Sequence, residues 1–335
     1  MMHFLLALLP SALNVPLRRM MGARIGRGAR IYFGTLLAVR DVAIGEGACI
    51  GPFAVIRADS LRVGAHTQIK PLTLIKAREI QLGEYVHIAP TAVIAGDLTP
   101  TCRLEAGDHT RIFPFCWLEP GEGITLGNHV GIGGHTLIFT HGAWSDYLLG
   151  GPVSYGPVVI EDRVWLPWRV FVLANVTIGH DAIIGAGSIV TKSVPPNALA
   201  AGMPAKTISE TAIRPIDAAE RLRRAEHILE EYAQRGLPGA RDRIAIDDPQ
   251  PLGRGDVLFI VNDAFEGNER ESLLERGINI LDHPRGRLIV SKEERYLDDF
   301  MSFLRRYGIR VARDSATSMV QPVLDDARVS SRSAI

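Results

Sequence analysis

Cysteine is scarce in this 335-residue chain, and its placement excludes two common kinds of stabilisation. The three cysteines are Cys49, Cys102 and Cys116, an odd number without paired spacing. Such a set provides neither a disulfide framework nor a cysteine zinc site. We therefore expect the protein to work in a reducing, cytoplasmic environment.

The chain also lacks net charge and a long apolar run. Its 37 basic residues balance 37 acidic ones, and no basic stripe interleaved with aromatic residues occurs, so we expect no nucleic-acid partner. Residues 3–17 are apolar but contain Pro10 and Pro16, and they fall short of the roughly 20 apolar residues that span a bilayer. The basic residues Arg18 and Arg19 follow this run, whereas a secretory signal has its basic residues first.

What the chain does contain is a repeat, in which an aliphatic residue followed by glycine returns every 19 residues. Two more aliphatic residues follow at six-residue steps, giving Ile25/Ile31/Leu37, Ile44/Ile50/Ile56, Val63/Ile69/Ile75 and Leu82/Ile88/Ile94, and later Leu126/Ile132/Ile138, Ile160/Leu166/Val172 and Ile178/Ile184/Val190. A six-residue period fits neither a helix nor one long alternating strand, so each hexad predicts a short strand and a corner. Three hexads make a triangular coil, and stacked coils make a mainly β solenoid whose glycines permit the corner conformations.

The segment before the repeat, residues 1–22, is expected to cap the open end of the solenoid. Without a cap, the apolar interior of the first coil would face water. An alternative use of residues 3–19 is as a peripheral anchor at the inner face of the membrane.

The repeat predicts a solenoid domain over residues 23–210, and a helix follows it. Pro195 and Pro196 are expected to end the repeat, because proline donates no ladder hydrogen bond. Residues 211–236 predict one amphipathic helix packed along the solenoid.

A second, smaller domain is predicted beyond a linker at residues 237–253, which are rich in proline and charge. Residues 254–314 show strand and helix patterns in the order β-α-β-β-α-β, compatible with a ferredoxin-like α+β domain. The composition of residues 315–335 predicts a disordered tail.

The spacing of the repeat is broken by an insertion after Ile138. Ile160 follows Ile138 by 22 positions, where regular spacing allows six or seven. Long excursions from a rigid scaffold often hold binding and catalytic groups. His141 stands at the start of this loop and is our first candidate for a catalytic residue.

The solenoid resembles the hexapeptide-repeat acyltransferases, in particular the galactoside and maltose O-acetyltransferase type. The similarity covers about residues 23–210 and is most specific in four segments: VWL at 164–166, ANVTIG at 174–179, IGAGSIVTK at 184–192 and AGMPAK at 201–206. The resemblance implies a left-handed parallel β-helix and a homotrimer with sites between adjacent subunits. It also implies transfer of acetyl from acetyl-CoA to a hydroxyl of a sugar or glycan precursor, without a metal.

The resemblance assigns two catalytic positions. His141 corresponds to the histidine that acts as the base, and an imidazole with a reference pKa near 6.5 suits the removal of a hydroxyl proton at neutral pH. The backbone N–H of Trp168 corresponds to the donor that stabilises the negative charge on the thioester oxygen.

Five further positions are implied for acetyl-CoA. They are Trp165 beside the cofactor, Ala186 against the pantetheine arm, Thr191 and Lys192 near the pyrophosphate, and Lys206 near the 3′-phosphate. Ammonium and hydroxyl groups suit a ligand that contains several phosphate charges.

Three positions depart from the family pattern. Phe113 stands where the galactoside enzymes have an asparagine that holds the sugar, and Gly121 stands where they have an aspartate. Pro167 replaces a glycine next to Trp168. The acceptor side therefore differs from the galactoside enzymes, so the identity of the acceptor is left open between sugars and between a hydroxyl and an amine.

Two other functions are compatible with a solenoid of this type. His129, His135 and His141 recur at six-residue spacing, as in a γ-carbonic-anhydrase-like zinc protein, but a step of six moves to the next face of a coil, so the three side chains are expected to diverge. Alternatively, the solenoid is a non-catalytic trimeric scaffold for the C-terminal domain, which predicts no binding of coenzyme A.

Overall fold

The computed structural model describes residues 2–143, 145–250, 252–262 and 268–315. Its contacts divide the chain into two units, Met1–Arg214 and Pro215–Ile335. The tail predicted at 315–335 lies outside the described residues except for Ser315, which ends a strand.

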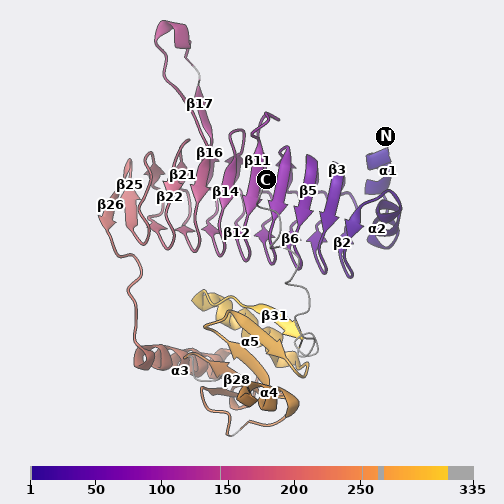
Figure 1. The fold of residues 1–335 in the computed structure, drawn as a ribbon, viewed down its shortest axis with the longest axis vertical. Helices are drawn as coiled ribbons and strands as arrows, with labels where there is room; N and C mark the ends of the chain where they lie inside the picture. The colour runs from indigo at the N-terminus through magenta and orange to yellow at the C-terminus, as the bar shows by residue number, and fades with distance from the viewer. Residues whose placement is uncertain (1, 144, 251, 263–267, 316–335) are drawn as a thin grey trace, which may run out of the picture. The chain divides into compact units, whose positions relative to one another are not determined.

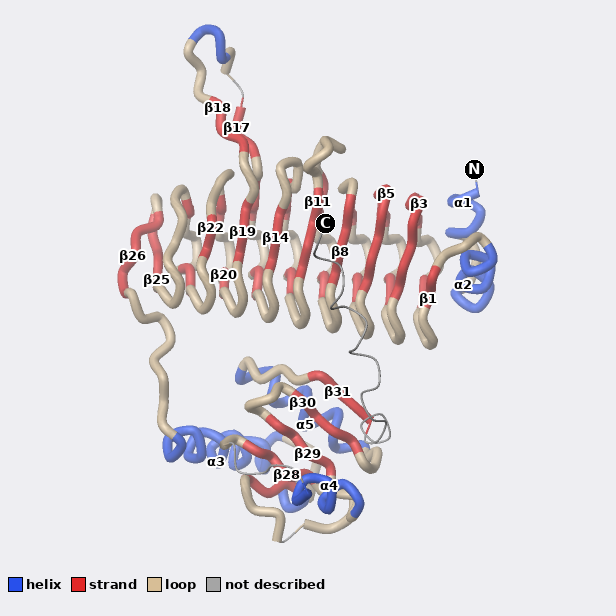
Figure 2. The backbone as a smooth tube through the Cα atoms, viewed as in Figure 1, coloured by secondary structure: helices blue, strands red, loops and turns tan. Residues whose placement is uncertain are grey.

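The first unit is a left-handed parallel β-helix, as predicted, and successive coils add short strands to three faces (Figures 1 and 2). The first face contains β1 (Arg24–Ile25), β8 (Glu79–Leu82), β11 (Arg103–Ala106), β14 (Ile124–Leu126), β19 (Val158–Ile160) and β22 (Thr177–Ile178). The second contains β2 (Arg30–Ile31), β4 (Cys49–Ile50), β6 (Gln68–Ile69), β9 (His87–Ile88), β12 (Arg111–Ile112), β15 (Gly131–Ile132), β20 (Trp165–Leu166), β23 (Ile183–Ile184), β25 (Leu199–Gly202) and β26 (Ala205–Ser209). The third contains β7 (Leu74–Lys76), β10 (Val93–Ala95), β13 (Trp117–Glu119), β16 (Leu137–Phe139), β21 (Phe171–Val172) and β24 (Ile189–Val190). Two longer strands, β3 (Leu36–Ile44) and β5 (Val55–Val63), continue from the third face into the first.

Every aliphatic residue that the hexads assign to the interior is buried, and together they form one continuous core. The residues between Ile94 and Leu126, where the hexad pattern is interrupted, add a coil to the same stack. In this coil Ala106 takes the interior position between Leu82 and Leu126, with which it pairs in register. The small alanine side chain, and the unequal spacing on either side of it, hid this coil from the hexad pattern.

The glycines of the repeat have a different role from the one that the sequence predicts. Gly26, Gly45 and Gly64 do not adopt left-handed backbone angles. A Cβ atom at these positions would instead lie 2.4–2.5 Å from backbone atoms of the next coil. They are needed because adjacent coils approach too closely for any side chain at this point.

The left-handed conformation occurs two residues after the glycine, mostly in residues that have side chains. His66, Tyr85, His109 and His129 have φ angles of 55–58°, which cost an L-residue roughly 1–2 kcal/mol each. Their rings stack along one edge of the solenoid with centroids 4.8–5.0 Å apart. Because a ring pair of this kind contributes about 0.5–1.5 kcal/mol, the stack offsets much of the backbone cost.

Two helices, α1 (Met2–Ala7) and α2 (Ser11–Met20), lie against the first coil. The Gly34 N–H donates to the Ala7 carbonyl (2.7 Å), the Ile31 N–H donates to Ser11 Oγ (3.0 Å), and Val15 belongs to the solenoid core. Within the described residues, no helix has the length and apolar character needed to cross a membrane.

At its other end the solenoid continues through two strands beyond Pro195 and Pro196, where the repeat is expected to end, and β26 ends at Ser209, within the domain predicted for residues 23–210. β25 pairs in parallel with β23, and β26 then turns back antiparallel to β25. The two prolines lie in the turn before β25, where neither has to donate to a ladder.

The second unit is an α+β domain. It contains α3 (Ala218–Arg235), β27 (Ile244–Ile246), β28 (Val257–Ile260), α4 (Asn268–Glu275), β29 (Asn279–Asp282), β30 (Arg287–Val290), α5 (Arg295–Leu304) and β31 (Ala312–Ser315), with single 3-10 turns at Arg241–Arg243 and Arg305–Tyr307. The predicted β-α-β-β-α-β order is confirmed from β28 to β31. The strands form one sheet in chain order, β27 to β31, and only β29 and β30 pair antiparallel.

Three expectations for this unit are wrong. The sheet is not ferredoxin-like, because its strands follow chain order. α3 is expected to pack along the solenoid, but its buried residues Leu229 and Tyr232 belong to the core of the second unit, together with Phe300 of α5. The predicted linker at 237–253 contains β27, whose Ile244 is buried in the same core, and its prolines and charges obscured this short strand.

Candidate active site

The inserted loop leaves the solenoid after β16 and forms a hairpin of β17 (His141–Ala143) and β18 (Val153–Tyr155), with a single 3-10 turn at Tyr147–Leu149. Figure 1 shows the hairpin projecting from the edge of the coils. His141 pairs with Tyr155, and their rings stack with centroids 6.2 Å apart. The Gly156 N–H donates to the Thr140 carbonyl (3.1 Å) at the base of the hairpin. His141 therefore lies at the junction of loop and solenoid.

A buried carboxylate holds the His141 ring. His141 Nδ1 lies 2.8 Å from Oε2 of Glu119, the last residue of β13, and the two side chains are 44% and 8% exposed. An ionised carboxylate only accepts hydrogen bonds, so this contact assigns the proton to Nδ1 and leaves the lone pair on Nε2. A half-exposed imidazole in this tautomer, oriented by an acid, is the arrangement of a general base.

Glu119 is itself fixed by short contacts. The Thr140 hydroxyl lies 2.8 Å from Oε2, and the Gly121 N–H donates to Oε1 (2.9 Å). A Cβ atom at Gly96 or Gly121 would lie 2.6 or 2.7 Å from Oε1, so both glycines make room for the carboxylate. Gly121, which stands where the galactoside enzymes have an aspartate, thus contacts the carboxylate of Glu119.

Glu119 is the functional candidate that the sequence analysis missed. It pairs with Phe139 in the β13–β16 ladder, one coil before His141. Comparing equivalent corner positions in successive coils would have placed a carboxyl group beside the loop histidine. The hexad rule describes interior positions only, so it does not identify such a residue.

Thr191 and Lys192 lie at the same edge of the third face as His141. Ile138 of β16 pairs with Val172 of β21, which pairs with Val190 of β24. Thr191 and Lys192 are therefore level with Phe139 and Thr140 two coils earlier, the two residues that precede His141. Since strands are about 4.8 Å apart, two coils correspond to roughly 10 Å. Both Thr191 and Lys192 are exposed.

Trp168 and Ala186 lie at the opposite edge of the third face, in equivalent positions of successive coils. The Gly187 N–H donates to the Trp168 carbonyl (3.0 Å), and the Arg169 N–H donates to the Gly134 carbonyl (3.0 Å), so hydrogen bonding between coils continues directly after Pro167. The Trp168 ring is half exposed beside the His135 ring, with centroids 5.8 Å apart. Among the described residues, none accepts a hydrogen bond from the backbone N–H of Trp168.

The two remaining candidates, Trp165 and Lys206, are on the second face. Trp165 is in β20, with its side chain half exposed, and pairs with Ile183 of β23. Lys206 is exposed on β26 and pairs with Ala201 of β25. Both lie on the Trp168 side of the solenoid, away from the edge that holds His141.

The predicted site residues therefore form two groups within one chain. His141, Thr191 and Lys192 occupy one edge of the third face, and Trp168 and Ala186 the other. His141 is six residues beyond His135, whose ring contacts Trp168, so the two edges are roughly 15–20 Å apart at the rise of an extended strand. A thioester cannot contact the His141 imidazole and the Trp168 N–H of the same chain at once.

The three histidines considered for zinc have different neighbours. His129 stacks on His109, His135 lies between Phe115 and Trp168, and His141 contacts Glu119. The described residues contain no group of three or more histidine, cysteine or acidic side chains arranged to hold a metal ion. The expected divergence of the three rings is thus observed.

Comparison with known proteins gives a consistent assignment, although no family model matches the chain. A putative acetyltransferase of Schizosaccharomyces pombe is 44% identical over 87 residues, 25% of this chain and 42% of that protein. The galactoside O-acetyltransferase of Escherichia coli is 40% identical over 89 residues, 26% of this chain and 44% of that protein. This chain thus covers less than half the length of these curated relatives.

Among solved structures, a hexapeptide-repeat-containing acetyltransferase from Vibrio cholerae is 30% identical, with a TM-score of 0.32, over 38% of this chain and 75% of that chain. A second structure of that Vibrio protein contains acetyl coenzyme A; the match is 24% identical, with a TM-score of 0.30, over 59% of this chain and 75% of that chain. On these sequence matches, the chain belongs to the hexapeptide-repeat acetyltransferase family.

Proposed function

We propose that this protein transfers an acetyl group from acetyl-CoA to a hydroxyl group of a sugar or glycan precursor. The main support is the Glu119–His141 pair, a half-exposed imidazole oriented by a buried carboxylate at the edge that also contains Thr191 and Lys192. Family membership supports the reaction class. The galactoside acceptor is named only for relatives that this chain covers in part.

In this reaction His141 Nε2 removes the proton of the acceptor hydroxyl as the oxygen attacks the thioester carbonyl carbon. Glu119 is a positioning residue, which holds Nδ1–H and stabilises the imidazolium that forms. The negative charge on the carbonyl oxygen is met by the backbone N–H of Trp168. When the tetrahedral intermediate collapses, the C–S bond breaks and Nε2–H returns its proton to the departing thiolate. The products are the acetyl ester and coenzyme A with a free thiol.

For acetyl-CoA, we propose the five positions that the resemblance implies. Lys192 and Lys206 are exposed ammonium groups that suit the pyrophosphate and 3′-phosphate, and the Thr191 hydroxyl adds a donor. Ala186 is exposed and small, so the pantetheine arm can pass close to its backbone. Trp165 offers a half-exposed ring face beside the cofactor.

We further propose a homotrimer in which each site is formed by two chains. One chain supplies His141, and its neighbour supplies Trp168 and Ala186. This arrangement is supported by the positions of His141 and of the Trp168 and Ala186 pair on opposite edges of the third face, because one chain alone cannot bring them together. A closed ring of three identical contacts uses both edges of every chain.

The acceptor is proposed to contact the base of the hairpin. Tyr155 is exposed there, and its ring stacks on His141. Phe113, which replaces the asparagine of the galactoside enzymes, is exposed at the opposite edge of the third face, next to Gly133 of the following coil. In the proposed trimer the neighbouring chain would bring this edge to the site. Exposed aromatic rings of this kind favour a sugar ring presented with its apolar face, and the phosphates or glycan chain of a precursor can extend into solvent.

The proposed function is tested by measuring thiol release from acetyl-CoA with a panel of sugars, nucleotide sugars and oligosaccharides. We expect release to depend on an acceptor, and to disappear when the acetylated hydroxyl is replaced by hydrogen. Lys192→Ala and Lys206→Ala should weaken acetyl-CoA binding, because each removes a phosphate contact. A non-catalytic scaffold would neither bind acetyl-CoA nor release a thiol, and that outcome would refute the proposal.

We also propose that the protein is cytoplasmic and makes peripheral contact with the membrane through residues 3–19. Phe4 of α1, Leu8 in the turn after it and Leu13 of α2 are exposed. Residues 1–40 contain six arginines and no acidic residue, although the whole chain has a net charge of zero. Arg18 is buried, and Arg24 and Arg40 pair with Asp41 and Asp59. The exposed arginines of this segment that pair with no described acidic residue are therefore Arg19, Arg27 and Arg30. Apolar side chains beside such arginines suit a surface of anionic lipids.

Flotation with lipid vesicles tests this contact. The full chain should float with vesicles containing phosphatidylglycerol and remain behind with pure phosphatidylcholine vesicles. The double change Leu8→Ser and Leu13→Ser should abolish flotation, whereas Ile208→Ser, at another exposed apolar position, should not. Equal flotation with both kinds of vesicle, or with the double variant, would contradict the proposal.

A further inference from the structure

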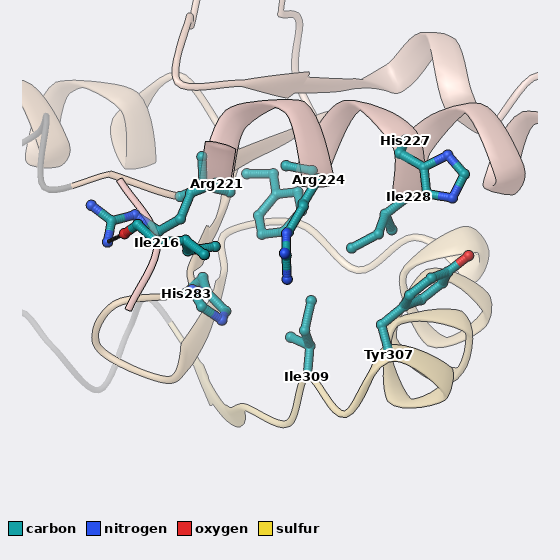
Figure 3. Close-up of a pocket in the computed structure, with 11 residues that line it drawn as sticks. Ile216, Arg221, Arg224, His227, Ile228, His283, Tyr307 and Ile309 are labelled. Carbon is teal, nitrogen blue, oxygen red and sulfur yellow. Dashed lines mark hydrogen bonds between the residues drawn. The ribbon is translucent and has the colours of Figure 1, made fainter. Parts of the chain in front are cut away.

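The second unit contains a cavity of about 450 Å³ that the proposed acetyl transfer does not use. It lies at the carboxyl ends of the parallel strands β28 and β29, between α3 and the segment that precedes β31 (Figure 3). Open α/β sheets bind ligands at this edge, where the strands end and the loops begin. The volume is also within the usual range for a small-molecule site.

The lining of the cavity has an apolar part and a cationic part. Ile216, Ala225, Ile228, Phe259, Val261 and Ile309 supply apolar surface. Arg221, Arg224, His227 and His283 supply nitrogen donors, and no described residue of the lining is acidic. This combination fits a ligand with an apolar body and one anionic group.

Arg221 is held in place by its neighbours. Its Nε donates to Asn262 Oδ1 (3.1 Å), and its Nη1 donates to the Ile216 carbonyl (3.4 Å). Asn262 is fixed in turn by Asp247, whose Oδ2 accepts from the Asn262 amide (2.9 Å). Arg221 therefore contributes a fixed positive charge to the wall of the cavity, while much of its hydrogen-bonding capacity is already used.

Arg224 is the guanidinium that points into the cavity. Figure 3 shows it extending from α3 into the space between His283 and Ile309. Within the described residues its hydrogen bond is from Nε to Glu220 Oε1 (2.7 Å), which leaves the two terminal nitrogens for a ligand. Glu220 also accepts from Arg223, so one carboxylate is shared by two guanidinium groups.

His283 completes the polar side of the cavity. Burial lowers the pKa of the His283 imidazole, and the charge of Arg221 lowers it further. A neutral imidazole both donates and accepts, and it adds no second positive charge to the point where Arg224 ends. One available guanidinium beside a neutral ring matches a single planar anion better than a highly charged one.

We propose that this cavity binds an organic monocarboxylate, with its apolar body against Phe259, Val261 and Ile309 and its carboxylate on Arg224. The terminal nitrogens of Arg224 donate to the two carboxylate oxygens. His283 lines the same end of the cavity and supplies a neutral donor. The second unit is thus a ligand-binding domain for a small acid, and this inference does not depend on the acetyl-transfer chemistry of the first unit.

Isothermal titration of the full-length protein with 4-phenylbutanoate, octanoate and benzoate tests the proposal. Their amides and phenyl phosphate serve as matched probes. At least one carboxylate should bind, and its amide should bind at least about tenfold more weakly, because a charge-assisted pair is lost. Arg224→Gln should weaken carboxylate binding by about 10- to 100-fold.

The control is Arg223→Gln, which removes the neighbouring arginine that shares Glu220 but does not line the cavity. Its affinity for the carboxylates should match that of the unchanged protein. The proposal is overturned if no carboxylate binds, if the amides bind equally well, if phenyl phosphate binds more tightly than every carboxylate, or if Arg224→Gln leaves the affinity unchanged.

Discussion

Replacing His141 with alanine is expected to lower kcat for acceptor-dependent thiol release about 10²–10⁴-fold, the usual contribution of a general base. The Glu119→Gln change should lower kcat in the same direction, because the amide can donate to Nδ1 and so favour the tautomer that lacks a lone pair on Nε2. KM for acetyl-CoA should change little in either variant, since neither side chain is proposed to contact the cofactor. Steady-state thiol-release kinetics measure both quantities.

His180 provides a matched control for this experiment. Its Nδ1 lies 2.8 Å from Asp181 Oδ2, and its side chain is about as exposed as that of His141, but it belongs to the edge of the solenoid that contains neither group of site residues. His180→Ala should retain full activity. A His141→Ala enzyme with undiminished kcat would remove His141 from the role of base, and an unaffected Glu119→Gln enzyme would remove Glu119 as its positioning residue.

The solenoid could be predicted from the sequence because its core imposes a simple rule. Each interior position recurs at a fixed step and must be filled by an aliphatic side chain, so the hexads identified the buried residues correctly. The rule fails where the interior residue is small, as at Ala106, because alanine gives a weak apolar signal. It also did not reveal why the repeat glycines are needed, since the limiting contact at Gly64 is with the backbone of the next coil.

The second unit shows a different limit. Local patterns located β28, β29, β30 and both helices, but they placed the last strand at residues 309–312, a range that starts three residues before β31. Pairing of strands, however, depends on contacts between distant residues, so the pattern could not distinguish a sheet in chain order from a ferredoxin-like one. The cavity at Arg224 depends on this pairing, because the chain-order sheet brings the ends of β28 and β29 to the same edge.

Only part of the candidate site could be predicted from the sequence, because the rest depends on contacts between residues that are distant along the chain. The loop insertion is a feature of the sequence, and it pointed to His141 directly. Glu119 is 22 residues upstream and becomes a neighbour only when coils are stacked in register. The division of the site between the two edges of the third face likewise follows from register, which the hexad spacing does not specify.

Because the proposed site is divided between two subunits, two variants that are inactive alone are expected to restore activity when they assemble together. His141→Ala removes the base from one edge, and Ala186→Trp should block the pantetheine arm at the other, so each homotrimer should be inactive. If the two variants are co-expressed in equal amounts, chains assemble at random, and about a quarter of the sites should combine an intact His141 with an intact Ala186. Thiol-release activity should therefore return to about 25% of the unchanged enzyme at equal protein concentration.

The control is a mixture of the two variants purified separately, which should remain inactive for as long as the trimers do not exchange chains. Sedimentation of each variant should show that it still assembles, so that the loss of activity reflects the altered site. A site contained within one chain would give no recovery on co-expression, because every chain would lack either the base or the cofactor surface. Recovery is expected only if His141 of one subunit acts on a thioester bound by the next, which is the arrangement that the roughly 15–20 Å between the two edges requires.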